Sequence, residues 1–62
     1  MEHNKVQALR ETNAWSIAEL ARKAGLAPQT VSKMEKGVKT AKNSKLKVTK
    51  AFGVQFDDLF SE

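Results

Sequence analysis

This sequence has no cysteine, one histidine, one proline and three glycines among its 62 residues. The absence of cysteine excludes disulfides and thiolate metal sites, so we expect a protein of the reducing cytoplasm. No stretch approaches the roughly 20 apolar residues that span a membrane. Residues 1–5 also lack the apolar segment of a signal peptide. We therefore expect one cytoplasmic domain over residues 1–62, with no membrane contact.

Side chains that carry out catalysis are equally scarce. His3 is the only histidine, and neither a cysteine nor a pair of carboxylates accompanies it. Ser16 and Ser32 have no general base within reach in any helical register, and a catalytic site needs a nucleophile and a base in mutual contact. A metal site fails for the same shortage of ligands. The sequence therefore predicts no enzyme, no metal, no cofactor and no small-molecule ligand.

Positive charge is concentrated in the second half of the chain. The formal net charge is +4, and residues 33–50 carry seven lysines against a single acidic residue, Glu35. Residues 51–62 are acidic, with Asp57, Asp58 and Glu62. The basic segment indicates a polyanionic partner, although an ordinary solvated lysine surface has the same composition.

Apolar residues recur at helical spacing and runs of β-branched residues are missing, so we predict an all-α fold. The expected architecture is a compact bundle of five short helices over residues 4–12, 17–24, 28–36, about 44–52 and about 56–60. Residues 38–43 are polar and basic and are predicted to form a loop.

Several residues mark the ends of these helices. Ser16 and Glu19 have the spacing of a capping box at the start of the second helix. Gly25 is expected to end that helix in the left-handed conformation. Pro28 suits the first position of the third helix, because a residue there has no helical partner for its N–H. Gly37 and Gly53 are expected to end the third and fourth helices.

The predicted core lies along one face of each helix. Its members are Val6 and Leu9 with Ala8 beside them, Ile17, Leu20, Ala21, Ala24, Val31, Met34, Leu46, Val48, Thr49, Ala51 and Phe52, and Phe56, Leu59 and Phe60 are expected to close it. Trp15 is expected to pack between two short helices, since its ring contributes a large apolar area. Stacking on a nucleic-acid base is the alternative for Trp15, but no second exposed aromatic side chain is expected beside it.

The second and third helices have the spacing of a helix-turn-helix, in which a short turn containing glycine joins two helices. A steep crossing of the two helices requires a small residue, a turn residue and a residue that fills the angle between them. Ala21, Gly25 and Val31 supply these three properties in that order.

Residues 20–37, LARKAGLAPQTVSKMEKG, resemble the Cro/CI-type (XRE) helix-turn-helix family of phage repressors and small bacterial regulators. The similarity continues through residues 50–54 and 57–60. It implies a lambda-repressor-like DNA-binding domain and a sequence-specific transcriptional regulator, expected to be a repressor. The implied partner is double-stranded DNA with a palindromic operator, bound by a homodimer.

The resemblance also implies roles for individual residues. The third helix enters the major groove, so Gln29, Thr30 and Lys33 are expected to contact base edges. The residues expected to contact phosphates are Ser16, Ile17, Lys36, Lys39, Thr40, Lys42 and Asn43. Phosphate contact or simple solvation remains open for Lys45, Lys47 and Lys50. Arg10 and Glu35 are expected to form a partly buried ion pair that orients the first helix against the third.

Three departures from the family pattern bear on these expectations. Ala27 stands where relatives carry a capping serine or threonine, and Pro28 replaces a polar side chain that often contacts a base. Lys42 and Lys45 occupy positions that are commonly apolar, which leaves the start of the fourth helix open. The alternative function is an antitoxin-like or accessory module that binds another protein through Phe56, Leu59 and Phe60.

Overall fold

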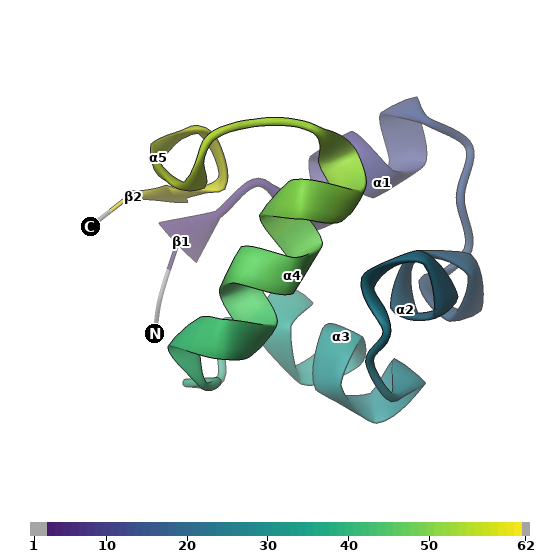
Figure 1. The fold of residues 1–62 in the computed structure, drawn as a ribbon, viewed down its shortest axis with the longest axis horizontal. Coiled ribbons are helices and arrows are strands. Elements are labelled where there is room, and N and C mark those ends of the chain that lie inside the picture. The colour runs from purple at the N-terminus through teal and green to yellow at the C-terminus, as the bar shows by residue number, and fades with distance from the viewer. Residues whose placement is uncertain (1–2, 62) are drawn as a thin grey trace.

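The structure is a computed structural model that describes residues 3–61 (Figure 1). Its elements are β1 (His3–Asn4), α1 (Val6–Thr12), α2 (Ile17–Ala24), α3 (Pro28–Glu35), α4 (Lys42–Phe52), α5 (Phe56–Leu59) and β2 (Phe60–Ser61). Five helices in the described part of the chain confirm the all-α prediction. In Figure 1, α4 lies between the α2–α3 pair and the end of the molecule where β1 meets α5 and β2.

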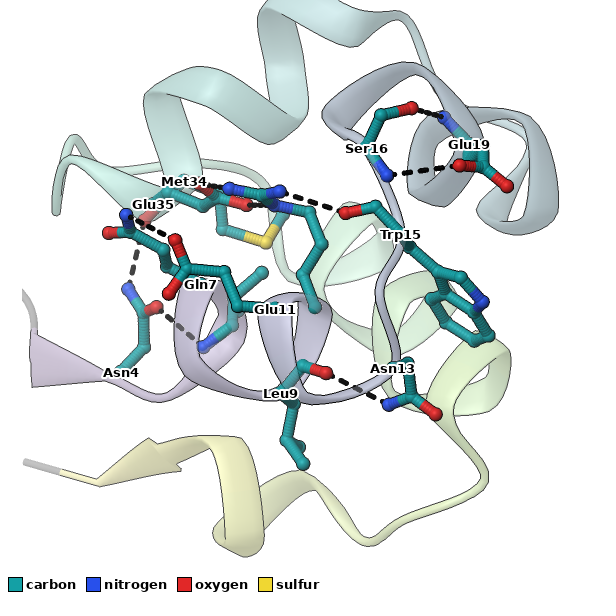
Figure 2. A network of polar contacts seen from close by, with 12 residues as sticks. Asn4, Gln7, Leu9, Glu11, Asn13, Trp15, Ser16, Glu19, Met34 and Glu35 are labelled. Carbon is teal, nitrogen blue, oxygen red and sulfur yellow. Dashed lines mark hydrogen bonds and ion pairs between the residues drawn. The ribbon is translucent and has the colours of Figure 1, made fainter.

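Helix α2 begins and ends where the sequence predicts. The Ser16 hydroxyl accepts a hydrogen bond from the Glu19 N–H at 3.1 Å, and the Ser16 N–H donates to Glu19 Oε1 at 3.2 Å (Figure 2). These two bonds satisfy donors that the first turn would otherwise leave without partners. At the other end Gly25 has a φ of 72°, the left-handed conformation expected of it.

The start of α4 differs from the prediction. The helix begins at Lys42, two residues before the predicted residue 44, so Lys42 and Asn43 are helical rather than part of a loop. Both side chains are exposed. A solvent-facing first turn has no apolar periodicity, and Ala41 provides no capping side chain, so nothing in the sequence marks this boundary.

The other helices differ at their ends. Helix α1 begins at Val6 instead of residue 4, because Asn4 belongs to β1, and α3 ends at Glu35, with Lys36 as its C-cap. Helix α5 ends at Leu59, because Phe60 belongs to β2.

The short strand pair was not predicted. Strands β1 and β2 run antiparallel, with His3 opposite Ser61 and Asn4 opposite Phe60. The Lys5 N–H extends the pairing by donating to the Leu59 carbonyl at 2.9 Å. Two residues are too few to show the alternation by which a strand is recognised in a sequence. The pair joins the two ends of the described chain.

One hydrophobic core contacts all five helices. Its buried apolar members are Val6, Leu20, Ala21, Ala24, Val31, Met34, Val48, Leu59 and Phe60. Thr49 is buried with them, and its hydroxyl donates to the Leu46 carbonyl at 2.7 Å. Trp15 packs at the edge of this core, where its ring stacks on Phe52 with 5.4 Å between centroids.

The predictions that Ala8 and Leu46 face the core are wrong. Ala8 is exposed, because it lies to one side of the face that Val6 and Leu9 turn to the core. Leu46 of α4 is exposed as well. Its side chain is 39% exposed, whereas Val48 and Thr49 are buried. Leu46 precedes Val48 by two positions and therefore lies about 160° from it around the helix. The apolar spacing of α4 did not reveal which of its apolar residues define the inward face.

Candidate nucleic-acid interface

Helices α2 and α3 form the predicted helix-turn-helix. The Leu26 N–H donates to the Ala21 carbonyl at 2.8 Å and so closes the turn after Gly25. Ala21 and Val31 are buried between the two helices. A Cβ placed on Gly25 would meet no atom within 4 Å, so its positive φ, rather than lack of space, requires glycine there.

Helix α3 has one buried face and one open face. Val31 and Met34 are fully buried, while Gln29 and Lys33 are exposed and Thr30 is half-buried. Gln29 and Lys33 are one helical turn apart and therefore lie on the same side of the helix. The buried face fixes how α3 sits on the domain, and the open face offers an amide and an ammonium group to a ligand.

The segment after α3 gathers exposed cations. Lys36, Lys39 and Lys42 are exposed, as is Asn43 in the first turn of α4. The N-cap of α4, Ala41, makes no side-chain hydrogen bond, so this positive helix end has no capping oxygen of its own. The Thr40 hydroxyl beside it is buried and has no hydrogen-bond partner among the residues that the structure describes.

The start of α2 offers fewer donors than its sequence suggests. Ser16 is exposed and Ile17 half-buried. The Ser16 N–H and hydroxyl oxygen are both engaged by Glu19 within the capping box. The serine O–H and the N–H groups of Ile17 and Ala18, which have no acceptor within the helix, are the donors that this end of α2 brings to an anion.

Three lysines lie over aromatic rings, which sequence reasoning missed. Lys42 Nζ is 6.0 Å from the centroid of Phe56, and Lys45 Nζ is 5.4 Å from that of Phe60. Lys23 Nζ is 4.9 Å from the centroid of Trp15. The contacts of Lys42 and Lys45 join the basic α4 to the aromatic C-terminal end of the core, and that of Lys23 joins α2 to the segment before it. These contacts could not be predicted from the sequence, because only the tertiary fold brings each lysine to its ring.

Arg10 and Glu35 form the ion pair that the sequence predicts. Arg10 Nε and Glu35 Oε2 are 2.6 Å apart, and Arg10 Nη2 donates a second hydrogen bond to Glu35 Oε1 at 3.2 Å. The side chains are 13% and 7% exposed. The hydrogen bond with Glu35 raises the pKa of Arg10 above its usual value, against the opposing effect of burial. Arg10 therefore stays charged across the physiological pH range.

Arg10 also contacts the segment before α2. Its remaining guanidinium nitrogen donates to the Trp15 carbonyl at 2.9 Å. One side chain of α1 thus joins the last turn of α3 to the residue before the N-cap of α2 (Figure 2). The ion pair therefore fixes the relative position of both helices of the helix-turn-helix.

The described residues were also compared with the requirements of a metal site and of a membrane-spanning helix. Within residues 3–61, no group of three or more acidic, histidine or cysteine side chains is placed to hold a metal ion. None of the helices over the same residues has the length and apolar character needed to cross a membrane.

These features define a helix-turn-helix domain whose third helix is open to a ligand. A family model described as helix-turn-helix matches residues 6–59. The chain therefore belongs to the Cro/CI-type (XRE) helix-turn-helix family, whose members bind DNA and are not enzymes. The comparison with curated proteins gives no match.

Proposed function

We propose that this protein is a sequence-specific regulator of transcription, acting as a repressor, which reads the major groove with α3. The observation that carries the proposal is the division of α3 into two faces. Val31 and Met34 anchor it in the core, while Gln29 and Lys33 point away from the core. A helix held in this way enters a groove as a rigid body, which base readout requires.

The side chains on the open face have chemistry that suits bases. A glutamine amide pairs with N6 and N7 of adenine, and a lysine donates to the acceptors of guanine. The methyl group of Thr30 is the third element, since it can contact the methyl group of thymine. We assign base contacts to Gln29, Thr30 and Lys33.

The phosphate contacts are assigned to the two flanks of α3. Ser16 and Ile17 lie before it in the chain, at the start of α2. On the other flank are Lys36, Lys39, Thr40, Lys42 and Asn43, around the uncapped start of α4. Contacts of this kind hold the protein in register on the duplex but do not read sequence.

A single recognition helix reads few base pairs, so we propose that two copies bind a palindromic operator as a homodimer. Occupancy of that operator would block transcription, and protein concentration would set the degree of repression. The lack of cysteine is consistent with a cytoplasmic location.

The alternative of an antitoxin-like or accessory module is less well supported. It depends on a free surface at Phe56, Leu59 and Phe60. Leu59 and Phe60 are instead buried in the core, and Phe56 is half-buried against the Phe60 ring. These residues close the core, and little of them is left for a protein partner.

Selection of bound duplexes from a random-sequence DNA library at near-physiological salt tests the proposal. Enrichment of a short inverted repeat is the expected result, and its half-sites would show what Gln29, Thr30 and Lys33 read. Recovery of unenriched DNA that is lost as salt rises would contradict it. In that case the lysines would bind phosphates without readout, and specificity would require a protein partner.

A further inference from the structure

Asn4 makes two hydrogen bonds in opposite directions. Its Oδ1 accepts from the Val6 N–H at 3.1 Å, and its Nδ2 donates to the Met34 carbonyl at 2.9 Å (Figure 2). Because a carbonyl oxygen only accepts and an amide nitrogen only donates, these two partners fix the orientation of the amide. The first bond serves the start of α1, and the second reaches the last turn of α3.

The contact with Met34 falls next to the Arg10–Glu35 ion pair. Met34 and Glu35 are the last two residues of α3, and each is held by a side chain from the N-terminal part of the domain. Asn4 holds the backbone carbonyl, and Arg10 holds the carboxylate. Two attachments at successive residues restrict both the tilt and the rotation of this helix end.

The position of Asn4 is itself fixed by the strand pair. Asn4 lies opposite Phe60, which is buried, and the next residue, Lys5, donates its N–H to the Leu59 carbonyl. The N-terminal segment is therefore attached to the C-terminal end of the core, so Asn4 holds α3 from a fixed support.

The beginning of α3 has no comparable attachment from a capping side chain. Ala27 is its N-cap and makes no side-chain hydrogen bond. The polar contacts that fix α3 from outside the helix-turn-helix thus act at its C-terminal end. A small rotation there would displace Gln29 and Lys33, because a helix of eight residues moves as one body.

We propose that Asn4 is a positioning residue for sequence recognition, which sets the angle of α3 through the Met34 carbonyl. This inference rests on the proposed function of α3 in base readout. Its consequence is a change in discrimination between DNA sequences, because phosphate contacts by flexible lysines tolerate small rotations that bidentate base contacts do not.

Two substitutions remove the donor to Met34 and keep an acceptor for the Val6 N–H. Asn4→Asp retains an oxygen for the Val6 N–H but cannot donate to the Met34 carbonyl at neutral pH. Asn4→Ser retains a hydroxyl that can accept from the Val6 N–H without adding charge, and its shorter side chain does not reach Met34. The matched control is Asn13→Asp, since the exposed Asn13 also donates to a backbone carbonyl, that of Leu9 at 2.8 Å within α1.

The first measurement is amide hydrogen exchange in the absence of DNA. The Gly37 and Val38 amides donate to the carbonyls of Met34 and Lys33 and report on the end of α3. We expect these two amides to exchange severalfold faster in both Asn4 variants than in the unsubstituted protein or the Asn13→Asp control. Unchanged exchange would overturn the inference whatever the protein does on DNA.

The second measurement is the ratio of affinities for the selected duplex and a scrambled duplex, at a temperature where circular dichroism shows every variant folded. We expect this ratio to fall about fivefold in both Asn4 variants, which is part of the discrimination that one bidentate base contact supplies, and to stay constant in Asn13→Asp. An unchanged ratio, which includes the case of equal losses of affinity for both duplexes, would overturn the inference. If the unsubstituted protein did not distinguish the duplexes, the proposed function would fail, and the inferred role in recognition would fail with it.

Discussion

Ala14, in the turn between α1 and α2, has a left-handed backbone conformation. Its φ is 59°, and among residues 3–61 every other residue with positive φ is a glycine. The left-handed conformation places the alanine Cβ too close to the backbone, at a cost of roughly 1–2 kcal/mol. The left-handed conformation of Gly25 could be predicted, because a glycine directly after a helical pattern is typical of a helix end. An alanine gives no such indication.

We therefore predict that Ala14→Gly stabilises the protein by about 0.5–1 kcal/mol, because glycine relieves the strain and loses part of that gain to its more flexible unfolded state. Urea denaturation measures the change in the free energy of unfolding. The control is Ala8→Gly in the exposed part of α1, which should destabilise by about the same amount. Destabilisation by both substitutions would show that Ala14 is not strained.

The polar contacts differ in how far the sequence could predict them. The Arg10–Glu35 pair was expected because the family resemblance named both positions, and the structure confirms it. The bond from Asn4 to the Met34 carbonyl joins residues 30 apart in sequence and ends on a backbone atom. Every residue has a backbone carbonyl, so the identity of residue 34 gave no indication of this bond. It could be identified only from the three-dimensional structure.

At the scale of the elements, helix caps decide which boundaries were predictable. Helix α2 has a signal at each end, Ser16 with Glu19 and then Gly25, and both of its bounds are confirmed. Helices α3 and α4 begin after alanines that make no side-chain cap. Pro28 still marked the start of α3, but α4 had no such residue, and its predicted start was wrong.

The same contrast predicts opposite effects for two substitutions. Ala27 has φ −74° and ψ 144°, the extended conformation of an N-cap, so Ala27→Ser should add a capping bond and stabilise the protein by about 1 kcal/mol. Ser16→Ala removes an existing cap and should destabilise it by about 1 kcal/mol. Thermal denaturation followed by circular dichroism tests both. A neutral Ala27→Ser would mean that the Thr30 N–H, which donates to the Ala27 carbonyl at 3.0 Å, gains nothing from a second acceptor.

At the scale of the whole molecule, most of the positive charge comes from one segment of the chain, whereas the core draws on every helix. The core unites all five helices and the strand pair, while the lysines of residues 33–50 surround the end of α3 and follow α4. The sequence alone predicted a basic segment and an apolar core. It could not predict that Lys42 and Lys45 lie over the rings of Phe56 and Phe60. These two contacts connect the basic segment to the aromatic end of the core.

This arrangement predicts that readout and electrostatic attraction can be separated by mutation. Gln29→Ala should reduce discrimination at one base position by about 1–3 kcal/mol and leave the affinity for unrelated duplexes nearly unchanged. Lys39→Ala should weaken binding to every duplex and lower the slope of log affinity against log salt by about one unit. Lys39 lies beside the uncapped start of α4, whereas Gln29 lies on the open face of α3.

Binding titrations at several salt concentrations, on the selected and scrambled duplexes, measure both quantities. Lys5→Ala is the matched control, because Lys5 is an exposed lysine at the start of α1 to which no DNA contact is assigned. It removes the same charge and should change the salt slope by much less than Lys39→Ala, since only a lysine in contact with phosphate releases a counterion. If Gln29→Ala and Lys39→Ala had the same effect on both duplexes, α3 would not be the part of the domain that reads sequence.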